Sequence, residues 1–195
     1  MNVAVYSGSF NPLHIGHLAI IKYMIEVAGF DMVYLIVSPK NPLKESISSD
    51  SGTDRYNAAL EAVNRHFPAK ADLEACHLQQ VIVDDIELNM PEPHYTIKTL
   101  DALRRREPDN NFNFIMGADN LADIRRWKDY SRILSEFGVA VYPRDGFNLE
   151  TIRQDLLNEN PAYNIQIINA PMVNISSTEI REAISRGEDV SHLLM

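Results

Sequence analysis

Residues 3–17 read V-A-V-Y-S-G-S-F-N-P-L-H-I-G-H, and this stretch decides the fold class. Val3 to Tyr6 form an apolar run of strand length. After it, apolar side chains recur at helical steps of three or four, which predicts a helix that begins near Leu13 or His14: Ile15, Leu18, Ile21, Ile25 and Ala28. Gly8 permits a sharp turn between the two elements. The chain therefore opens with a strand, a tight turn and a helix.

The same alternation continues to the C-terminal end. Strands are predicted at 32–37, 80–83, 112–116, 139–142 and 165–168. Helices are predicted at 54–66, around 97–103, at 149–156 and from 177, with a broken helical region at 120–136. Repeated β-α-β units predict an α/β fold with a Rossmann-like parallel sheet flanked by helices. We expect one domain over residues 1–195, with residues 45–53 as a loop and not a domain boundary.

Composition and charge exclude several classes of protein. The 195 residues include 18 Lys and Arg against 27 Asp and Glu, a formal net charge of −9, which disfavours nucleic-acid or anionic-membrane partners. The sequence shows neither an apolar run of membrane-spanning length nor a basic leader, so a cytoplasmic location is expected. Because Cys76 is alone, an internal disulfide and a cysteine-based zinc site are excluded.

Common nucleotide and metal motifs are missing from the sequence. The absence of G-x-G-x-x-G weakens a hydride-transfer function, and the absence of G-x-x-x-x-G-K-[ST] weakens a P-loop kinase or GTPase. Asp84, Asp85 and Glu87 could bind a cation, but an acidic strand end is usually solvated, and no metal site is assigned.

The first helix start is suited to phosphate. Its free N–H groups and positive dipole end favour an anion. His14 and His17 lie three residues apart on one face, where two imidazoles can donate hydrogen bonds to oxygens that gain charge. A single histidine here would more often be a cap, but the pair, together with Gly8 and Gly16, favours the functional interpretation.

A second helix start lies in I-S-S-T-E-I-R at residues 175–181. Ser176 and Glu179 have capping-box spacing, so an ordinary helix start explains the motif as well as phosphate binding does. Arg181, one turn later, offers a forked cation suited to polyphosphate. Two such helix starts fit a nucleoside triphosphate better than a single phosphate.

These two motifs resemble those of the HIGH-type nucleotidyltransferase superfamily, and the chain is most similar to its bacterial nicotinate-nucleotide adenylyltransferase family. Four interior stretches add to the resemblance: 41–44 (N-P-L-K), 93–96 (P-H-Y-T), 117–119 (G-A-D) before Trp127, and 144–147 (R-D-G-F). The chain departs from the family pattern at Asn11, Lys128 and Asp145, where Asp, Tyr and Pro are usual.

The resemblance implies transfer of AMP from ATP to nicotinate mononucleotide with Mg²⁺, giving deamido-NAD and pyrophosphate. It implies that His14 and His17 are catalytic, with His17 acting on the α-phosphoryl group. The residues implied to bind ATP are Gly8, Ser9, Phe10, Ser176, Ser177 and Arg181. Those implied to bind the pyridine nucleotide are Lys44, Tyr95, Thr96, Asp119, Trp127 and Arg144.

Three alternatives stay open. The acceptor could be nicotinamide mononucleotide or phosphopantetheine, or the chain could be an inactive nucleotide-binding regulator. His14-Ile15-Gly16-His17 also matches class I aminoacyl-tRNA synthetases, but no KMSKS-like loop appears and the net charge opposes RNA. The sequence leaves the oligomeric state open, a homo-oligomer included.

Anionic substrates on an acidic chain predict a local positive patch, formed by two helix N-termini and these side chains: His14, His17, Lys44, Arg144 and Arg181.

Overall fold

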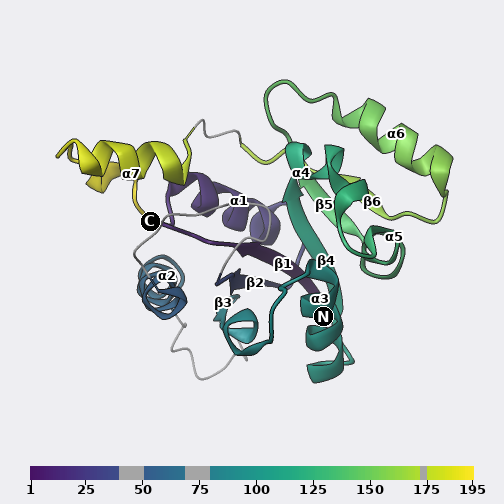
Figure 1. The fold of residues 1–195 in the computed structure, drawn as a ribbon, viewed down its shortest axis with the longest axis horizontal. Helices are drawn as coiled ribbons and strands as arrows, with labels where there is room; N and C mark the ends of the chain where they lie inside the picture. Colours follow the sequence, from purple (N-terminus) through teal and green to yellow (C-terminus); the bar gives the residue numbers. More distant parts are fainter. Residues whose placement is uncertain (40–50, 69–79, 172–174) are drawn as a thin grey trace.

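The structure, a computed structural model, describes residues 1–39, 51–68, 80–171 and 175–195. Six strands form one parallel sheet in the order β3-β2-β1-β4-β5-β6 (Figure 1). Their bounds are β1 (Asn2–Gly8), β2 (Met32–Val37), β3 (Val81–Asp84), β4 (Asn111–Gly117), β5 (Val139–Tyr142) and β6 (Ile165–Ile167). The predicted Rossmann-like α/β fold is confirmed, and every predicted strand forms within two residues of its expected bounds.

The helices also follow the predicted order. The longer ones are α1 (Ile15–Glu26), α2 (Gly52–His66), α3 (Thr96–Arg106), α6 (Leu149–Glu159) and α7 (Ser177–Ser185). The broken region at 120–136 divides into α4 (Ala118–Ala122), the 3₁₀ turn η2 (Ile124–Arg126), α5 (Tyr130–Arg132) and the π-helical turn η3 (Ile133–Phe137). Two further 3₁₀ turns are η1 (Ile86–Asn89) and η4 (Ser191–Leu193). In the described ranges, no helix is long and apolar enough to cross a membrane.

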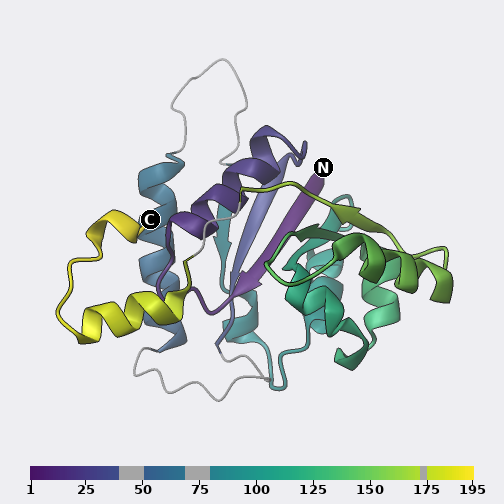
Figure 2. The ribbon, with the colours of Figure 1, turned by 90° about the horizontal axis from the view of Figure 1, so that it is seen from above.

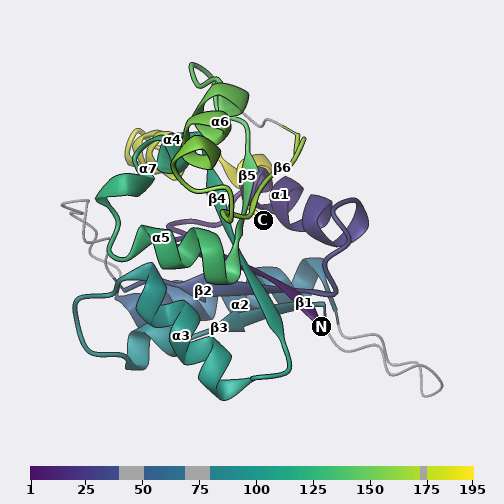
Figure 3. The same ribbon diagram turned by 90° about the vertical axis from the view of Figure 1, so that its right-hand side faces the viewer.

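The sheet separates two apolar cores because successive side chains of a strand point to opposite faces. In β1, Val3 and Val5 enter the core beneath α3, η3 and α6, whereas Ala4 and Tyr6 enter the core beneath α1 and α2. Figure 2 shows α2 and α7 on one side of β1 and α4–α6 on the other. Figure 3 shows α3 and α6 at opposite ends of the molecule. Burial on both faces explains why the strands read as continuous apolar runs.

Helix α2 differs from its prediction in two ways. It begins at Gly52 and not at Asp54, because Ser51 and Asp54 close a capping box; the last residues of the expected 45–53 loop therefore belong to the helix and its cap. Its buried face also differs, since Leu60 is 36% exposed. The buried positions are Arg55, Ala59, Ala62 and Val63, so an arginine lies within the apolar face.

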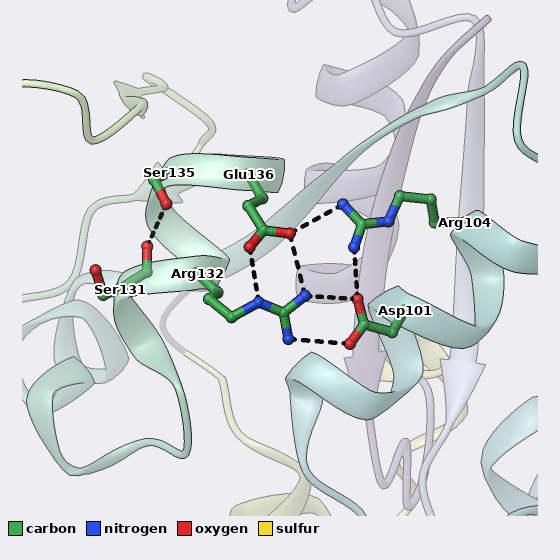
Figure 4. Close-up of polar contacts among 6 residues, drawn as sticks. All are labelled: Asp101, Arg104, Ser131, Arg132, Ser135 and Glu136. Atoms are coloured by element: carbon green, nitrogen blue, oxygen red, sulfur yellow. Dashed lines mark hydrogen bonds and ion pairs between the residues drawn. The ribbon is translucent and has the colours of Figure 1, made fainter.

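An ion-pair network joins α3 to the π-helical turn η3 (Figure 4). The Arg132 guanidinium donates to both oxygens of Asp101, at 3.0 and 3.1 Å, and to both oxygens of Glu136, at 2.7 and 3.1 Å. Arg104 bridges the same two carboxylates at 2.8 and 3.0 Å. These arginines hold the pKa of Glu136 down, to about 2, with the hydrogen bond from Arg132 as the largest cause. The network ties the outer helices of one sheet face together.

The strand order places a crevice between β1 and β4. In a sheet ordered 3-2-1-4-5-6 the connections reverse direction at this point, and ligands bind beyond the carboxyl ends of the strands there. Gly8 ends β1 and Gly117 ends β4, so the first motif and the Gly117-Ala118-Asp119 stretch flank one crevice. The C-terminal residue also reaches this edge, where the Met195 N–H donates to the Leu13 carbonyl at 3.4 Å.

Candidate active site

His14 and His17 form the N-terminal cap of α1. His14 Nδ1 accepts the Gly16 N–H at 3.2 Å, and His17 Nδ1 accepts the His14 N–H at 3.2 Å. Such a reciprocal pair is a capping box in which imidazoles replace the usual hydroxyl and carboxylate. The two rings stack with centroids 3.7 Å apart. The helix begins at Ile15, one or two residues after the predicted start near Leu13 or His14, because His14 is the capping residue.

The hydrogen bonds fix the protonation of both rings. Because each Nδ1 accepts a backbone N–H, the hydrogen of each neutral ring is on Nε2, which is left as a donor. The pKa of His14 is lowered to about 4, mainly by burial and then by the nearby Arg144 guanidinium. The pKa of His17 is lowered to about 3, mainly by burial and then by His14 and Arg144. Both rings are therefore neutral at pH 7, which corrects the expectation that they contribute positive charge to the site.

Two glycines make room for aromatic rings in the first motif. A Cβ on Gly16 would lie 3.0 Å from the His14 ring, and a Cβ on Gly8 would lie 3.0 Å from the Phe10 ring. Phe10 itself has a φ of 43°, and its ring meets His17 edge-on at 5.2 Å. Gly8 and Gly16 therefore serve the packing of the motif, and the positive φ at the turn belongs to Phe10 and not to Gly8.

Helix α7 brings the C-terminal motif against the first one. Arg181 Nη1 donates to the Asn11 carbonyl at 2.7 Å, and Ser177 Oγ donates to the Pro12 carbonyl at 3.1 Å. The two motifs, more than 150 residues apart in the sequence, thus form one site. Ser176 accepts the Glu179 N–H while the Glu179 carboxylate accepts the Ser176 N–H, so the capping interpretation of this motif is confirmed.

A pocket of about 210 Å³ opens at the carboxyl edge of the sheet. Its lining includes Gly8 and Ser9 from the first motif and the predicted Tyr95, Thr96 and Trp127 from the interior motifs. Trp127 is half-buried and meets Phe114 edge-on at 5.9 Å, so it belongs both to the core and to the pocket wall. The histidines stand beside the pocket, since the His17 ring lies 6.0 Å from that of Tyr6, which also lines it.

Asp119 and Arg144 lie together at the rim. Arg144 Nε is 3.9 Å from Asp119 Oδ1, and the guanidinium lies over the Tyr142 ring at 5.2 Å from its centroid. Their neighbours Asn120 and Tyr142 line the pocket. The predicted site residues in the described ranges thus gather around one crevice. Lys44 lies outside the described residues.

The chain is similar to known proteins over nearly its whole length. A cytidylyltransferase-like family model matches residues 5–183. The chain is 39% identical to the probable nicotinate-nucleotide adenylyltransferase of Flavobacterium psychrophilum, over 100% of this chain and 92% of that one. It is 36% identical to the protein of the same description from Bacteroides fragilis, over 97% of this chain and 85% of that one.

The chain belongs to the nicotinate-nucleotide adenylyltransferase family. The resemblance expected from the sequence is therefore confirmed. Among solved structures, the nicotinic acid mononucleotide adenylyltransferase of Plasmodium falciparum complexed with NaAD has a TM-score of 0.74 and 21% identity. That match covers 97% of this chain and 86% of that one. The match confirms the fold over nearly the whole chain of this family member.

Arg55 is a residue of the site that the sequence prediction missed. It is 5% exposed, and its guanidinium donates to the carbonyls of Ser9 at 2.7 Å, Ser38 at 2.7 Å and Pro39 at 2.8 Å. Ser9 follows β1 and Ser38 follows β2, and both line the pocket. The available signal was the helical phase, because Arg55, Ala59 and Ala62 recur at steps of four and three.

The acidic end of β3 is not solvated, contrary to expectation. Asp84 is buried, accepts the Ile86 N–H at 2.9 Å and forms an ion pair with Arg106. Glu87 is also buried and lines the pocket, while Asp85 is exposed. Glu87 lies in η1, which directly follows β3, and its carboxylate accepts the hydroxyl of Thr99 in α3 at 2.7 Å. The three carboxylates therefore have three different environments.

Proposed function

We propose that this chain transfers AMP from ATP to nicotinate mononucleotide, giving deamido-NAD and pyrophosphate. The observation that carries the proposal is the position of the His14–His17 pair beside the pocket lined by Tyr95, Thr96 and Trp127. The donors suit a phosphate chain, and the pocket suits a flat ring. Family membership and the printed description of the relatives support the same reaction.

The reaction needs positioning and charge stabilisation from the protein. A phosphate oxygen of the mononucleotide forms a bond to the α-phosphorus of ATP. The bond from that phosphorus to the bridging oxygen breaks, and pyrophosphate leaves with the electron pair. In this proposal the Nε2–H groups of His14 and His17 donate to the α-phosphoryl oxygens as their negative charge grows. Neutral donors held by the backbone need no rearrangement during the step.

The other contacts to the phosphates of ATP come from the first motif and from the C-terminal motif at residues 175–181. Backbone groups of Gly8, Ser9 and Phe10 bind ATP in this proposal. Ser176, Ser177 and Arg181 hold the leaving phosphates, and the hydrogen bonds of Ser177 and Arg181 to the first motif place them at the same crevice.

The acceptor contacts are assigned to the pocket. Trp127 stacks on the pyridine ring in this proposal, and the N-terminus of α3 takes the nicotinate carboxylate. Tyr95 is at the N-cap position of α3, but its side chain accepts no hydrogen bond from the N–H groups of the first turn. In α1, α2, α6 and α7 the N-cap side chain does accept one. An uncapped helix start at the pocket leaves N–H groups for a ligand anion. Thr96 is the first residue of this helix and contributes to the same contact. We further assign Asp119 to a ribose hydroxyl of the mononucleotide, and Lys44 and Arg144 to its phosphate.

Magnesium is proposed to enter with ATP. In the part of the chain that the structure describes, no three His, Cys, Asp or Glu side chains gather as a metal site. Magnesium often keeps waters and phosphate oxygens as its main ligands, so the proposed site fits an ion carried by the nucleotide. When bound, the ion neutralises charge on the departing phosphates.

The proposal also covers the domain organisation, the location and the partners of the enzyme. We propose a single nucleotidyltransferase domain over residues 1–195 that acts in the cytoplasm, without a nucleic-acid or membrane partner. The net charge of −9 supports the last point. Light scattering on the purified chain measures whether it is a homo-oligomer.

Pyrophosphate release tests the function. The chain is given ATP and Mg²⁺ with nicotinate mononucleotide, nicotinamide mononucleotide or phosphopantetheine in separate reactions. We expect the fastest release with nicotinate mononucleotide. Trp127→Leu should raise the KM for this acceptor and leave the KM for ATP near its original value, while Trp127→Phe should retain most of the affinity. Absence of release with all three acceptors would favour the inactive regulator.

A further inference from the structure

A buried carboxylate forms part of the wall of the proposed acceptor pocket. Glu87 lies in η1, is 4% exposed, and lines the pocket together with Tyr95 and Trp127. No role follows for it from the phosphate chemistry, because a negative charge near phosphates opposes their binding. Its place in the pyridine pocket needs another explanation.

The hydrogen bonds of Glu87 use one of its two oxygens. Oε1 accepts from Thr99 Oγ1 at 2.7 Å, and Ser7 Oγ lies at 3.5 Å from the same oxygen. Thr99 belongs to the first turns of α3, the helix whose uncapped start is assigned to the nicotinate carboxylate. Glu87 is thus held beside α3, the start of which also lines the pocket.

Glu87 has no cationic partner among residues 1–39, 51–68, 80–171 and 175–195. By contrast, the buried Asp84, three residues earlier, is paired with Arg106. Two other charged side chains line the pocket, Arg126 and Lys128, but they are exposed and lie near Asp123 and Asp129, at 3.9 and 3.6 Å. A buried carboxylate with hydrogen bonds to hydroxyls but no cationic partner carries an uncompensated charge, so a cation brought by the ligand would relieve that cost.

The proposed acceptor carries such a cation. In nicotinate mononucleotide the ring nitrogen is bonded to ribose, which makes the ring a pyridinium with a permanent positive charge. We propose that Glu87 is the counter-charge of this ring and selects a cationic pyridinium over a neutral ring of the same shape. This inference rests on the proposed function. In this proposal the two charged groups of the acceptor bind at different places. The nicotinate carboxylate binds at the N-terminus of α3, and the positively charged ring binds beside Glu87.

Glu87→Gln tests the role of the charge alone. The amide keeps the size of the side chain and an oxygen for the Thr99 hydrogen bond. The negative charge is lost, and the other oxygen becomes an NH2 group. Asp85→Asn is the matched control, because it removes a carboxylate two residues away that is exposed and does not line the pocket. Thermal unfolding of both variants reports whether the fold is kept.

The acceptors compared are nicotinate mononucleotide and its 1,4-dihydro form, which has a neutral ring and the same carboxylate and phosphate. The KM and the Kd, from pyrophosphate release and calorimetry, are measured for both. The unsubstituted chain should favour the cationic ring by roughly ten- to hundredfold. Glu87→Gln should lose this preference by binding the cationic ring less tightly, and Asp85→Asn should keep it.

Two outcomes would overturn the inference. One is equal binding of both rings by the unsubstituted chain, a result that does not depend on whether the variant folds. The other is an equal loss for both rings in Glu87→Gln, which would make Glu87 a support for α3 only. Failure of the proposed function is distinguishable, because the unsubstituted chain would then release no pyrophosphate with nicotinate mononucleotide.

Discussion

The imidazoles of His14 and His17 stack with their centroids 3.7 Å apart and their planes 35° apart, and each accepts a backbone N–H of the same helix turn through Nδ1. One pair of side chains thus does two things. It caps α1, and it leaves two Nε2–H donors fixed in direction. A capping box with hydroxyl and carboxylate groups would cap as well but would leave no such donors.

The two nitrogens of His17 can be tested separately. Asparagine places a polar atom near the Nδ1 position, and glutamine places one near Nε2. His17→Asn should keep the cap and most of the stability but lower kcat by about 10²–10³, the usual effect of losing one transition-state donor. His17→Gln should keep more of the activity and lose about 1 kcal/mol of stability with the cap. Turnover and thermal unfolding are measured for both, and equal kcat values would contradict the assigned role of Nε2.

Stability should fall as the pH drops below about 6.5. The ordinary histidine pKa is about 6.5, and the folded values for His14 and His17 are about 4 and about 3. Between these limits the unfolded chain binds more protons than the folded chain, so the free energy of unfolding decreases with falling pH. The slope approaches about 1.4 kcal/mol per pH unit for each histidine. Above pH 6.5 neither ring contributes.

Urea unfolding between pH 7 and 5 measures this slope. The same series on His17→Asn supplies the control, because one of the two titrating rings is then absent and the slope should fall by about half. An unchanged slope in that variant would show that other groups cause the pH dependence.

Arg55 should act as a positioning residue for the nucleotide site. Its hydrogen bonds to the carbonyls of Ser9, Ser38 and Pro39 fix these groups, and Ser9 and Ser38 line the pocket. Arg55→Met should lower kcat/KM by about tenfold to a hundredfold, because one buried and two partly buried carbonyls lose this donor. Arg55→Lys should recover part of this loss, since the ammonium can reach one or two of them.

Arg65→Met is the control for Arg55, because Arg65 is an exposed arginine near the other end of α2. It should leave both kinetic constants unchanged. If Arg55→Met lowered the unfolding temperature without changing KM or kcat in the remaining folded enzyme, the residue would be structural only.

The Asp101–Arg104–Arg132–Glu136 network should contribute modestly to stability and nothing to turnover. All four side chains are partly exposed, and such pairs usually give up to about 1 kcal/mol each. Arg132→Met should lower the unfolding free energy by about 1 kcal/mol at low salt, and the difference should shrink at 1 M salt as screening grows. A salt-independent loss would point to packing of η3 in place of charge.

Local sequence patterns were enough for the elements and their order. Runs such as residues 32–37, apolar throughout, gave β2 with its observed bounds because a strand buried on both faces needs no polar positions. The predicted buried face of α2 was partly wrong. In α2 the sequence favoured a stripe through Leu60, whereas the buried stripe runs through Arg55, because the carbonyls that receive this arginine come from distant loops.

The sequence by itself determined the parallel α/β fold, the two motifs and the family, since these depend on short-range periodicity and on residue types at fixed spacing. Only the tertiary structure decided that His14 and His17 are neutral and that Glu87 is buried in the pocket wall. It also decided that Arg55 binds the carbonyls of Ser9 and Ser38, which both line the pocket. Burial and partners distant in the chain control the charge state of a side chain, and neither can be read from its neighbours in sequence.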